Sequence, residues 1–173
     1  MSLHVIIDGY NLILRSGRFS PLDRTALELG RDALVEKLSA YKKIKRHKIT
    51  VVFDGSQKFY FQGPAFSQKG IGLRFSRHGE TADEVICAMA KKERQRAVVV
   101  SSDNEVCRRA ETFGAATMGT QTFEERMEMA LGAEISGDDE NDDSPWSGNT
   151  VKKGPSRRPP KKARQHLQKT GKL

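Results

Sequence analysis

Five short apolar runs lie along the first two thirds of the chain and predict β-strands over residues 3–7, 49–53, 71–75, 97–101 and 115–118. The first, second and fourth runs are almost continuously apolar and rich in β-branched residues. Strands that are covered on both faces of a sheet have this composition. The pattern therefore predicts a buried sheet whose strands are mainly parallel.

Helix start signals lie between these runs. They are an N-cap followed by proline at Ser20–Pro21 and three capping boxes, Ser or Thr followed three residues later by Glu, at residues 81–84, 102–105 and 122–125. Gly114 and Gly132 lie where two helices are expected to end. Strands that alternate with helices predict an α/β fold, in which helices cover both faces of a mainly parallel, five-stranded sheet.

The segment from Gly55 to Gly70 shows no clear periodicity. It contains four aromatic residues, Phe59, Tyr60, Phe61 and Phe66. Two interpretations stay open: the segment is a mobile flap, or it is a loop whose aromatic side chains complete the core.

Three of the predicted strands are followed by an aspartate: Asp8, Asp54 and Asp103. In an open parallel sheet, ligands bind beyond the carboxyl ends of the strands. Each aspartate also has a structural explanation, because Asp8 and Asp54 can stabilise turns and Asp103 can stabilise a helix start. Their joint position favours a functional site. Such carboxylates would repel one another unless a hard divalent cation, Mg²⁺ or Mn²⁺, lies between them.

A fourth acid, Asp83, lies in the first turn of the helix that follows the third predicted strand. Helical spacing places Asp83 at the edge of the buried stripe and Glu84 opposite, where the capping box uses it. We therefore favour Asp83 over Glu84. Glu80 can approach the same site from the preceding loop. Asn11 can bind a metal-coordinated water or orient Asp8, although it can also cap a turn.

Several other sites are excluded by the motifs. The chain has no GxxxxGK[ST] loop and no complete dinucleotide fingerprint, so no nucleotide cofactor is expected. The four histidines are scattered; His78 is close to the acids in sequence and can meet a substrate or be an ordinary loop residue.

The net charge of +8 is unevenly distributed along the chain. Residues 1–133 carry +5, residues 134–151 carry −6, and residues 152–173 carry nine basic and no acidic side chains. The last two segments have too little apolar surface to fold independently. We interpret them as an acidic linker with a solitary Trp146 and a basic, disordered tail. Such a tail binds nucleic acid or merely solubilises the protein.

The cellular location is inferred from sequence features that the chain lacks. The longest aliphatic run is Val98–Val100, which predicts no transmembrane helix, and the first residues predict no signal peptide. Cys87 and Cys107 have no CxxC spacing and fit reduced thiols. We therefore expect a cytoplasmic protein without a membrane partner.

Four strings, IIDGYNLI, VVFDG, GETADEVI and VVSSDNEV, occur in this order. Together they resemble the YacP-like branch of NYN domains, within the PIN-like ribonuclease class. The resemblance spans about residues 1–133 and does not include the linker or the tail. It implies a PIN-like three-layer sandwich and a metal-dependent endoribonuclease that uses Mg²⁺ or Mn²⁺. It also implies RNA as the substrate and, from one member of the branch, cleavage of mRNA at the ribosome.

Carried over by position, the resemblance assigns catalytic roles to Asp8, Asn11, Asp83 and Asp103. The metal ligands would be Asp8, Asp83 and Asp103, with Glu80 and Asp54 in less defined roles. Basic residues would bind the RNA backbone: Arg74, Arg77, Arg108 and Arg109 in the folded part, and Lys152, Lys153, Arg157, Arg158, Lys161, Lys162 and Arg164 in the tail. The lysine-rich run 42–48 lies before a strand, so we expect it at the opposite rim.

A second function stays open. The protein can be a non-catalytic RNA- or ribosome-binding module that keeps the fold and binds through its basic tail.

Overall fold

The computed structural model describes residues 2–15, 24–55, 65–135 and 170–171. In these ranges the chain forms β1 (His4–Asp8), α1 (Gly9–Arg15), α2 (Arg24–Lys45), β2 (Lys48–Phe53), β3 (Ala65–Gln68), β4 (Ile71–Phe75), α3 (Ala82–Glu93), the 3-10 helix η1 (Arg94–Arg96), β5 (Ala97–Val100), α4 (Asn104–Thr112), β6 (Ala116–Met118) and α5 (Thr120–Ile135). The predicted cap at Ser20 lies outside the described residues, as does the predicted linker except for its first two residues, which belong to α5.

The described strands form one mixed sheet in the order β3-β4-β2-β1-β5-β6. All neighbours are parallel except β3 and β4, which form an antiparallel hairpin. The predicted α/β class and mainly parallel sheet are confirmed. The predicted count of five strands is wrong, because β3 was included in the segment without periodicity. At four residues, half of them exposed, β3 is too short to give a pattern of its own.

The hairpin turn at Lys69 and Gly70 explains why β3 pairs with β4. Both residues have positive φ, 49° and 79°, which is the backbone of the two-residue turns that join antiparallel strands. Ser39 and Lys42 of α2 donate hydrogen bonds to the carbonyl oxygens of this turn. In β3, Phe66 lies opposite Leu73 and stacks on Phe75, with ring centroids 6.0 Å apart. Its contribution to the core supports the second interpretation for this residue.

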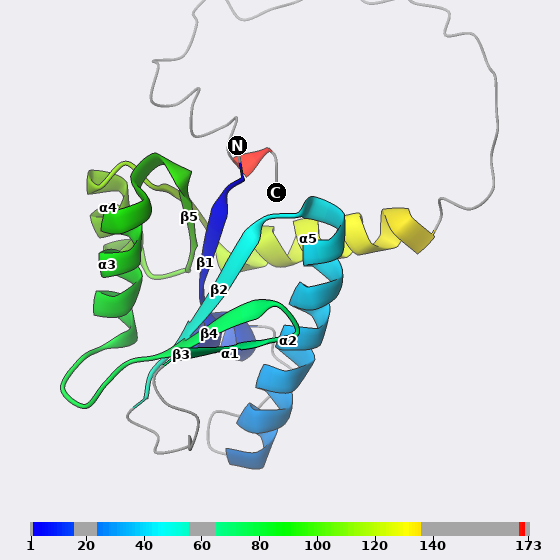
Figure 1. The fold of residues 1–173 in the computed structure, drawn as a ribbon, viewed down its shortest axis with the longest axis horizontal. Helices are drawn as coiled ribbons and strands as arrows, with labels where there is room; N and C mark the ends of the chain where they lie inside the picture. The colour runs from blue at the N-terminus through cyan, green and yellow to red at the C-terminus, as the bar shows by residue number, and fades with distance from the viewer. Residues whose placement is uncertain (1, 16–23, 56–64, 136–169, 172–173) are drawn as a thin grey trace, which may run out of the picture.

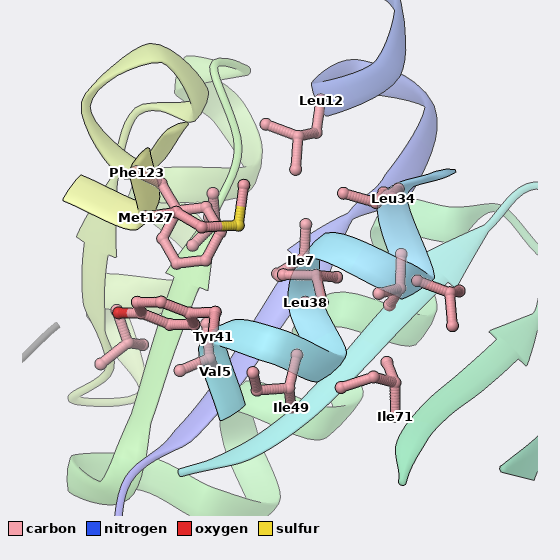
Figure 2. Packing of buried hydrophobic residues seen from close by; sticks show 14 of the residues in the cluster. Val5, Ile7, Leu12, Leu34, Leu38, Tyr41, Ile49, Ile71, Phe123 and Met127 are labelled. Atoms are coloured by element: carbon pink, nitrogen blue, oxygen red, sulfur yellow. The ribbon is translucent and has the colours of Figure 1, made fainter. Parts of the chain in front are cut away.

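The helices lie on the two faces of the sheet as predicted (Figure 1). Alternate residues of each strand point to opposite faces, so Val5 and Ile7 pack with α1, α2 and α5, while Ile6 packs with α3 and α4. Figure 2 shows the larger cluster, in which Tyr41 of α2 meets Phe123 of α5 edge to face with ring centroids 5.7 Å apart. Each large apolar side chain buried here contributes about 1.5–3 kcal/mol.

The helix starts follow their predicted signals only in part. Thr81 and Glu84 form the expected capping box of α3. At α4 the predicted cap, Ser102, is wrong: Asp103 is the N-cap, while the Ser102 hydroxyl lies 2.5 Å from that of Thr120. Helix α5 begins at Thr120, before the predicted cap at Thr122.

Of the two predicted helix ends, one is confirmed and one is wrong. Gly114 ends α4 with a φ of 85°, as expected. Gly132 does not end α5, which continues to Ile135. Ala130 and Leu131 pack on the larger core cluster, so tertiary contacts outweigh the local preference of glycine. Of the predicted tail, Thr170 and Gly171 are described; Thr170 is buried, and its carbonyl accepts a hydrogen bond from Arg126 of α5.

Candidate active site

Parallel pairing brings three of the predicted aspartates to one rim of the sheet. Asp8 ends β1, Asp54 follows β2, and Asp103 follows β5, which flanks β1 on the other side. Asp83 lies in the first turn of α3. The charges of Asp83 and Asp103 both raise the pKa of Asp8, so the three carboxylates are close enough to repel one another.

Asp8 is the most enclosed of these carboxylates. Its Oδ1 accepts a hydrogen bond from the Asn11 backbone N–H at 3.1 Å, and its Oδ2 accepts one from Ser101 Oγ at 3.3 Å. Burial is the largest cause that raises the Asp8 pKa, and these two hydrogen bonds oppose it without cancelling it. Asp8 is therefore fixed in position, with an anionic charge that the described residues do not fully compensate.

Asp83 is half-buried at the start of α3. Burial raises its pKa first, and the charge of Asp103 raises it further. Arg109 of α4 lowers it, which places one cation beside the acids. Glu84 is held by the capping box, where its carboxylate accepts from the Thr81 N–H at 3.0 Å. The two neighbouring acids therefore differ in environment as the helical spacing predicts.

Asp103 has a structural duty as well as its place at the rim. Its Oδ1 accepts hydrogen bonds from the backbone N–H groups of Glu105 and Val106, at 2.7 and 3.3 Å. Such a cap typically contributes about 1 kcal/mol to helix stability. The side chain is exposed. One carboxylate oxygen is thus committed to α4, and the other is available to the site.

Ser101 links Asp8 and Asp103; the sequence suggested a contact with Asp103 but not the contact with Asp8. Its buried hydroxyl donates to Asp8 Oδ2 and accepts a hydrogen bond from the Asp103 N–H at 3.1 Å. The only sequence signal was its place at the end of a strand that leads to Asp103. Ser101 sets the positions of both acids and is a positioning residue in this arrangement.

Asn11 contributes a buried polar atom that has no hydrogen-bond partner among the described residues. Its side-chain Oδ1 is buried, and no described residue donates a hydrogen bond to it. A buried polar atom in this state is costly unless a water or an ion satisfies it. Asn11 therefore fits the role of binding a water or a cation next to Asp8.

The structure treats Asp54 and Glu80 differently. Asp54 Oδ1 accepts a hydrogen bond from Ser76 Oγ at 3.3 Å, and its charge raises the pKa of Asp83. Glu80 instead turns back on its own loop, where Oε2 accepts from the Arg77 N–H at 3.2 Å. Glu80 also lines a separate cavity. Of these two predicted ligands, only Asp54 joins the acids at the rim.

The rim does not form a direct metal cage. Within the described ranges, no three His, Cys, Asp or Glu side chains lie close enough to hold an ion together. Asp8, Asp83 and Asp103 therefore do not share an ion by direct contact in this conformation. Mg²⁺ usually keeps several waters and is held by one or two carboxylates. The acids and the Asn11 oxygen fit a hydrated ion of this kind, so coordination through water stays a prediction.

The predicted RNA-binding residues fall into three groups. Arg109 of α4 lies beside Asp83, and Arg108 is exposed on α4. Arg74 and Arg77 line a cavity of about 780 Å³ bounded by α3 and the β3–β4 side of the sheet, together with His78. The predicted basic residues of the tail lie outside the described part of the chain.

Comparison with known proteins identifies relatives of this chain. The family model described as the YacP-like NYN domain matches residues 5–168. This match runs past residue 133, where the resemblance in the sequence ends, and includes most of the predicted linker and tail. In addition, no helix of the described residues has the length and apolar character needed to cross a membrane.

One curated relative is the uncharacterized protein YacP of Bacillus subtilis (strain 168), which is 28% identical over 87 residues. The aligned region spans 50% of this chain and about half, 51%, of that relative. Two crystal structures of Rae1 (YacP) from Bacillus subtilis have the same fold. One of them, of a mutant form, gives a TM-score of 0.63 at 23% identity, with 79% of this chain and 80% of that chain covered. The second structure gives 0.62 at 24% identity, with 79% and 78% covered.

Proposed function

Because the chain belongs to the YacP-like NYN domain family, which is a PIN-like nuclease family, we propose that it is a metal-dependent endoribonuclease. The observation that carries this proposal is the set of carboxylates at one rim, where burial and neighbouring acids raise the pKa values of Asp8 and Asp83. Such a set favours binding of a cation. A cation held there would meet the phosphodiester group of an RNA strand.

The reaction is hydrolysis of a phosphodiester bond. A water attacks phosphorus, the bond to the 3′ oxygen breaks, and the products carry a 5′-phosphate and a 3′-hydroxyl. The ion, Mg²⁺ or Mn²⁺, would be held through bound waters by Asp8 and Asp83, together with Asp103 and the Asn11 oxygen. Asp54 would have a less direct role in metal binding. A divalent ion bound there lowers the pKa of its water and stabilises charge on the scissile phosphate.

The protein groups around the ion have distinct tasks. Ser101 keeps Asp8 and Asp103 in register through its two hydrogen bonds. Arg109, next to Asp83, can bind the phosphate of the substrate. No described histidine is needed as a general base in this scheme. We expect the enzyme to act in the cytoplasm, and on mRNA at the ribosome as the family resemblance implies.

The test is cleavage of a 5′-labelled single-stranded RNA with Mn²⁺ or Mg²⁺, compared with EDTA. Asp8→Asn and Asp83→Asn should each lower the rate by at least about 100-fold, the scale at which active-site electrostatic groups act. Glu84→Gln is the matched control, because it removes the same charge one residue from Asp83 and keeps an oxygen for the cap. Equal cleavage by the wild type and the Asp8→Asn/Asp83→Asn double variant would refute the nuclease.

The missing direct cage of three carboxylates among the described residues favours one competing function. In this case the protein binds RNA or the ribosome through its basic tail and cuts nothing. Substituting Arg157, Arg158, Lys161 and Lys162 by glutamine should then abolish cosedimentation with ribosomes, whereas Asp8→Asn should leave it unchanged. A catalytic rate that falls with Asp8→Asn would decide against this module.

A further inference from the structure

The cavity between α3 and the β3–β4 side of the sheet has a cause in the packing. Helix α3 packs on β1, β5 and β2, and the core cluster on this face includes Ile6, Val52 and Val99. No described residue of β3 or β4 belongs to that cluster. On this face β4 presents Gly72 and Arg74 instead. The uncovered strip beside α3 is the cavity of about 780 Å³, which we call the α3 groove.

The α3 groove runs along the strands. At one end it is lined by Lys48, at the start of β2, and by Lys92, in the last turn of α3. At the other end it is lined by the turn from Arg77 to Glu80, which directly precedes the cap of α3 and so leads to Asp83. The five residues of β4 between these ends correspond to about 16 Å. An extended chain therefore fits the shape better than a compact ligand does.

The acids in the α3 groove are already satisfied within the protein. Glu93 lies 3.1 Å from His4 Nδ1 and 2.6 Å from Arg96 Nη2, and Glu80 accepts from the Arg77 N–H. His4 is buried on the floor, where its Nε2 lies 2.8 Å from Thr50 Oγ1. Glu93 is thus paired with Arg96, which does not line the groove, while Glu80 keeps its charge, so the four lining cations still exceed the acids.

The cations that line the α3 groove differ from these acids in their contacts. The side chains of Lys48, Arg74, Arg77 and Lys92 line it, and none forms an ion pair or hydrogen bond with another described residue. Arg74 and Lys48 also act electrostatically on His4 across the floor. Phe66 of β3 is also among the lining residues, although its ring stacks on Phe75 in the larger core cluster. A positively charged groove that follows an extended strand is typical of single-strand nucleic-acid binding.

We propose that the α3 groove binds the sugar–phosphate backbone of single-stranded RNA on one side of the cleavage point and leads it to the acidic rim. This inference rests on the proposed function for its direction, because the groove and the rim meet at the start of α3. Lys48, Arg74, Arg77 and Lys92 bind phosphates, and Gly72 keeps the floor low enough for the strand. A Cβ at Gly72 would lie 3.1 Å from Thr50 Oγ1.

The test measures binding without cleavage. The full chain is titrated into a fluorescently labelled single-stranded RNA in EDTA at several salt concentrations, with fluorescence anisotropy as readout. Lys48→Gln/Arg74→Gln/Lys92→Gln should weaken binding at least about tenfold and reduce the slope of log K against log salt by about 2, since each lost phosphate contact accounts for about 0.7. Lys43→Gln/Lys45→Gln/Lys91→Gln removes the same charge outside the groove and should change affinity less than about twofold.

A second pair of variants isolates charge from folding. Ala88 is exposed on α3 and lines the α3 groove. Ala88→Glu should weaken binding several-fold, and Ala88→Gln, of nearly the same size, should not. Equal affinities for these two variants, or equal losses in the groove and control triples, would overturn the proposal. An equal loss for duplex RNA, or full competition by inorganic phosphate alone, would overturn the assignment to a single strand.

The two proposals fail separately. If the wild type does not cleave RNA with Mn²⁺ and the groove triple still loses affinity, the nuclease is refuted and the α3 groove stands. If the wild type cleaves RNA and the groove triple binds like its control, only the groove proposal is refuted.

Discussion

Two partly buried acids lie beside opposite ends of β1 in opposite electrostatic states: Asp8 ends the strand, and Glu93 of α3 lies next to His4 at its start. At the carboxyl end, burial and neighbouring acids raise the pKa of Asp8. At the amino end, burial also works to raise the pKa of Glu93, but hydrogen bonds from His4 and Arg96 outweigh it and lower that pKa. The protein thus neutralises Glu93 itself and leaves Asp8 for an external cation. Unpaired charge, rather than burial alone, is what separates a candidate site from a structural pair.

His4 completes the pair at the amino end. Burial lowers its pKa, which favours the neutral ring, and Nδ1 lies 3.1 Å from a Glu93 carboxylate oxygen. Nε2 lies 2.8 Å from the Thr50 hydroxyl. Each nitrogen of the ring lies close to a polar group of the protein, which fits a structural role for His4.

The largest expected effect is the response to a divalent ion. Mn²⁺ at about 100 times its dissociation constant should stabilise the fold by about 2.7 kcal/mol, which raises Tm by about 5–10 °C for a chain of this size. The measurement is differential scanning fluorimetry with and without Mn²⁺. Asp8→Asn/Asp83→Asn should abolish the shift, while Glu93→Gln should keep it. An unchanged shift in the aspartate double variant would place the ion elsewhere.

The next effect concerns the self-neutralised pair. Glu93→Ala removes the carboxylate that lies 3.1 Å from the buried His4 Nδ1 and that pairs with Arg96, so it should lower the free energy of unfolding by about 2 kcal/mol. Glu93→Gln keeps an oxygen for His4 and should lose less than half of this. Urea unfolding at pH 7 measures both. Wild-type stability in Glu93→Ala would show that the contact between His4 and Glu93 contributes nothing.

The smallest effect has the opposite sign. Asp8→Asn should stabilise the ion-free protein at pH 7 by roughly 1 kcal/mol, since it removes a buried charge that the fold does not compensate. Because the folded-state pKa of Asp8 is raised above 3.8, this penalty is complete above the folded pKa and vanishes as pH falls below the unfolded value. The gain should therefore shrink between neutral pH and about pH 4 in thermal unfolding without metal. A loss of stability in Asp8→Asn would show that the fold does compensate the charge of Asp8.

Particular residues show how far sequence reasoning extended. The continuous apolar runs and the box at Thr81 were recognised because burial on two faces and helix capping leave local patterns. The strand β3 and the caps of α4 and α5 were not recognised from the sequence. Their outcomes depend on pairing partners that the local pattern does not identify, such as Leu73 for Phe66 across a hairpin and Thr120 for Ser102.

The candidate site divides in the same way. Position at the ends of parallel strands was enough to predict that Asp8, Asp54 and Asp103 share a rim, and helical spacing was enough to prefer Asp83 to Glu84. Glu80 was grouped with them because it is near in sequence, yet its carboxylate bonds within its own loop. From the sequence, Ser101 was a possible donor to Asp103 or to a phosphate; its contact with Asp8 was not predicted, because only the fold brings those two residues together.

By itself, the sequence determined the α/β class, the mainly parallel sheet and the rim at which the acids gather, because period, capping and strand polarity are local or follow from simple topology. The tertiary structure alone decided which charges are paired. It joined Glu93 of α3 to His4 of β1, left Asp8 without a cation among the described side chains, and opened the α3 groove where α3 does not cover β4. Charge compensation depends on distances between residues far apart in the chain, and no local pattern encodes those distances.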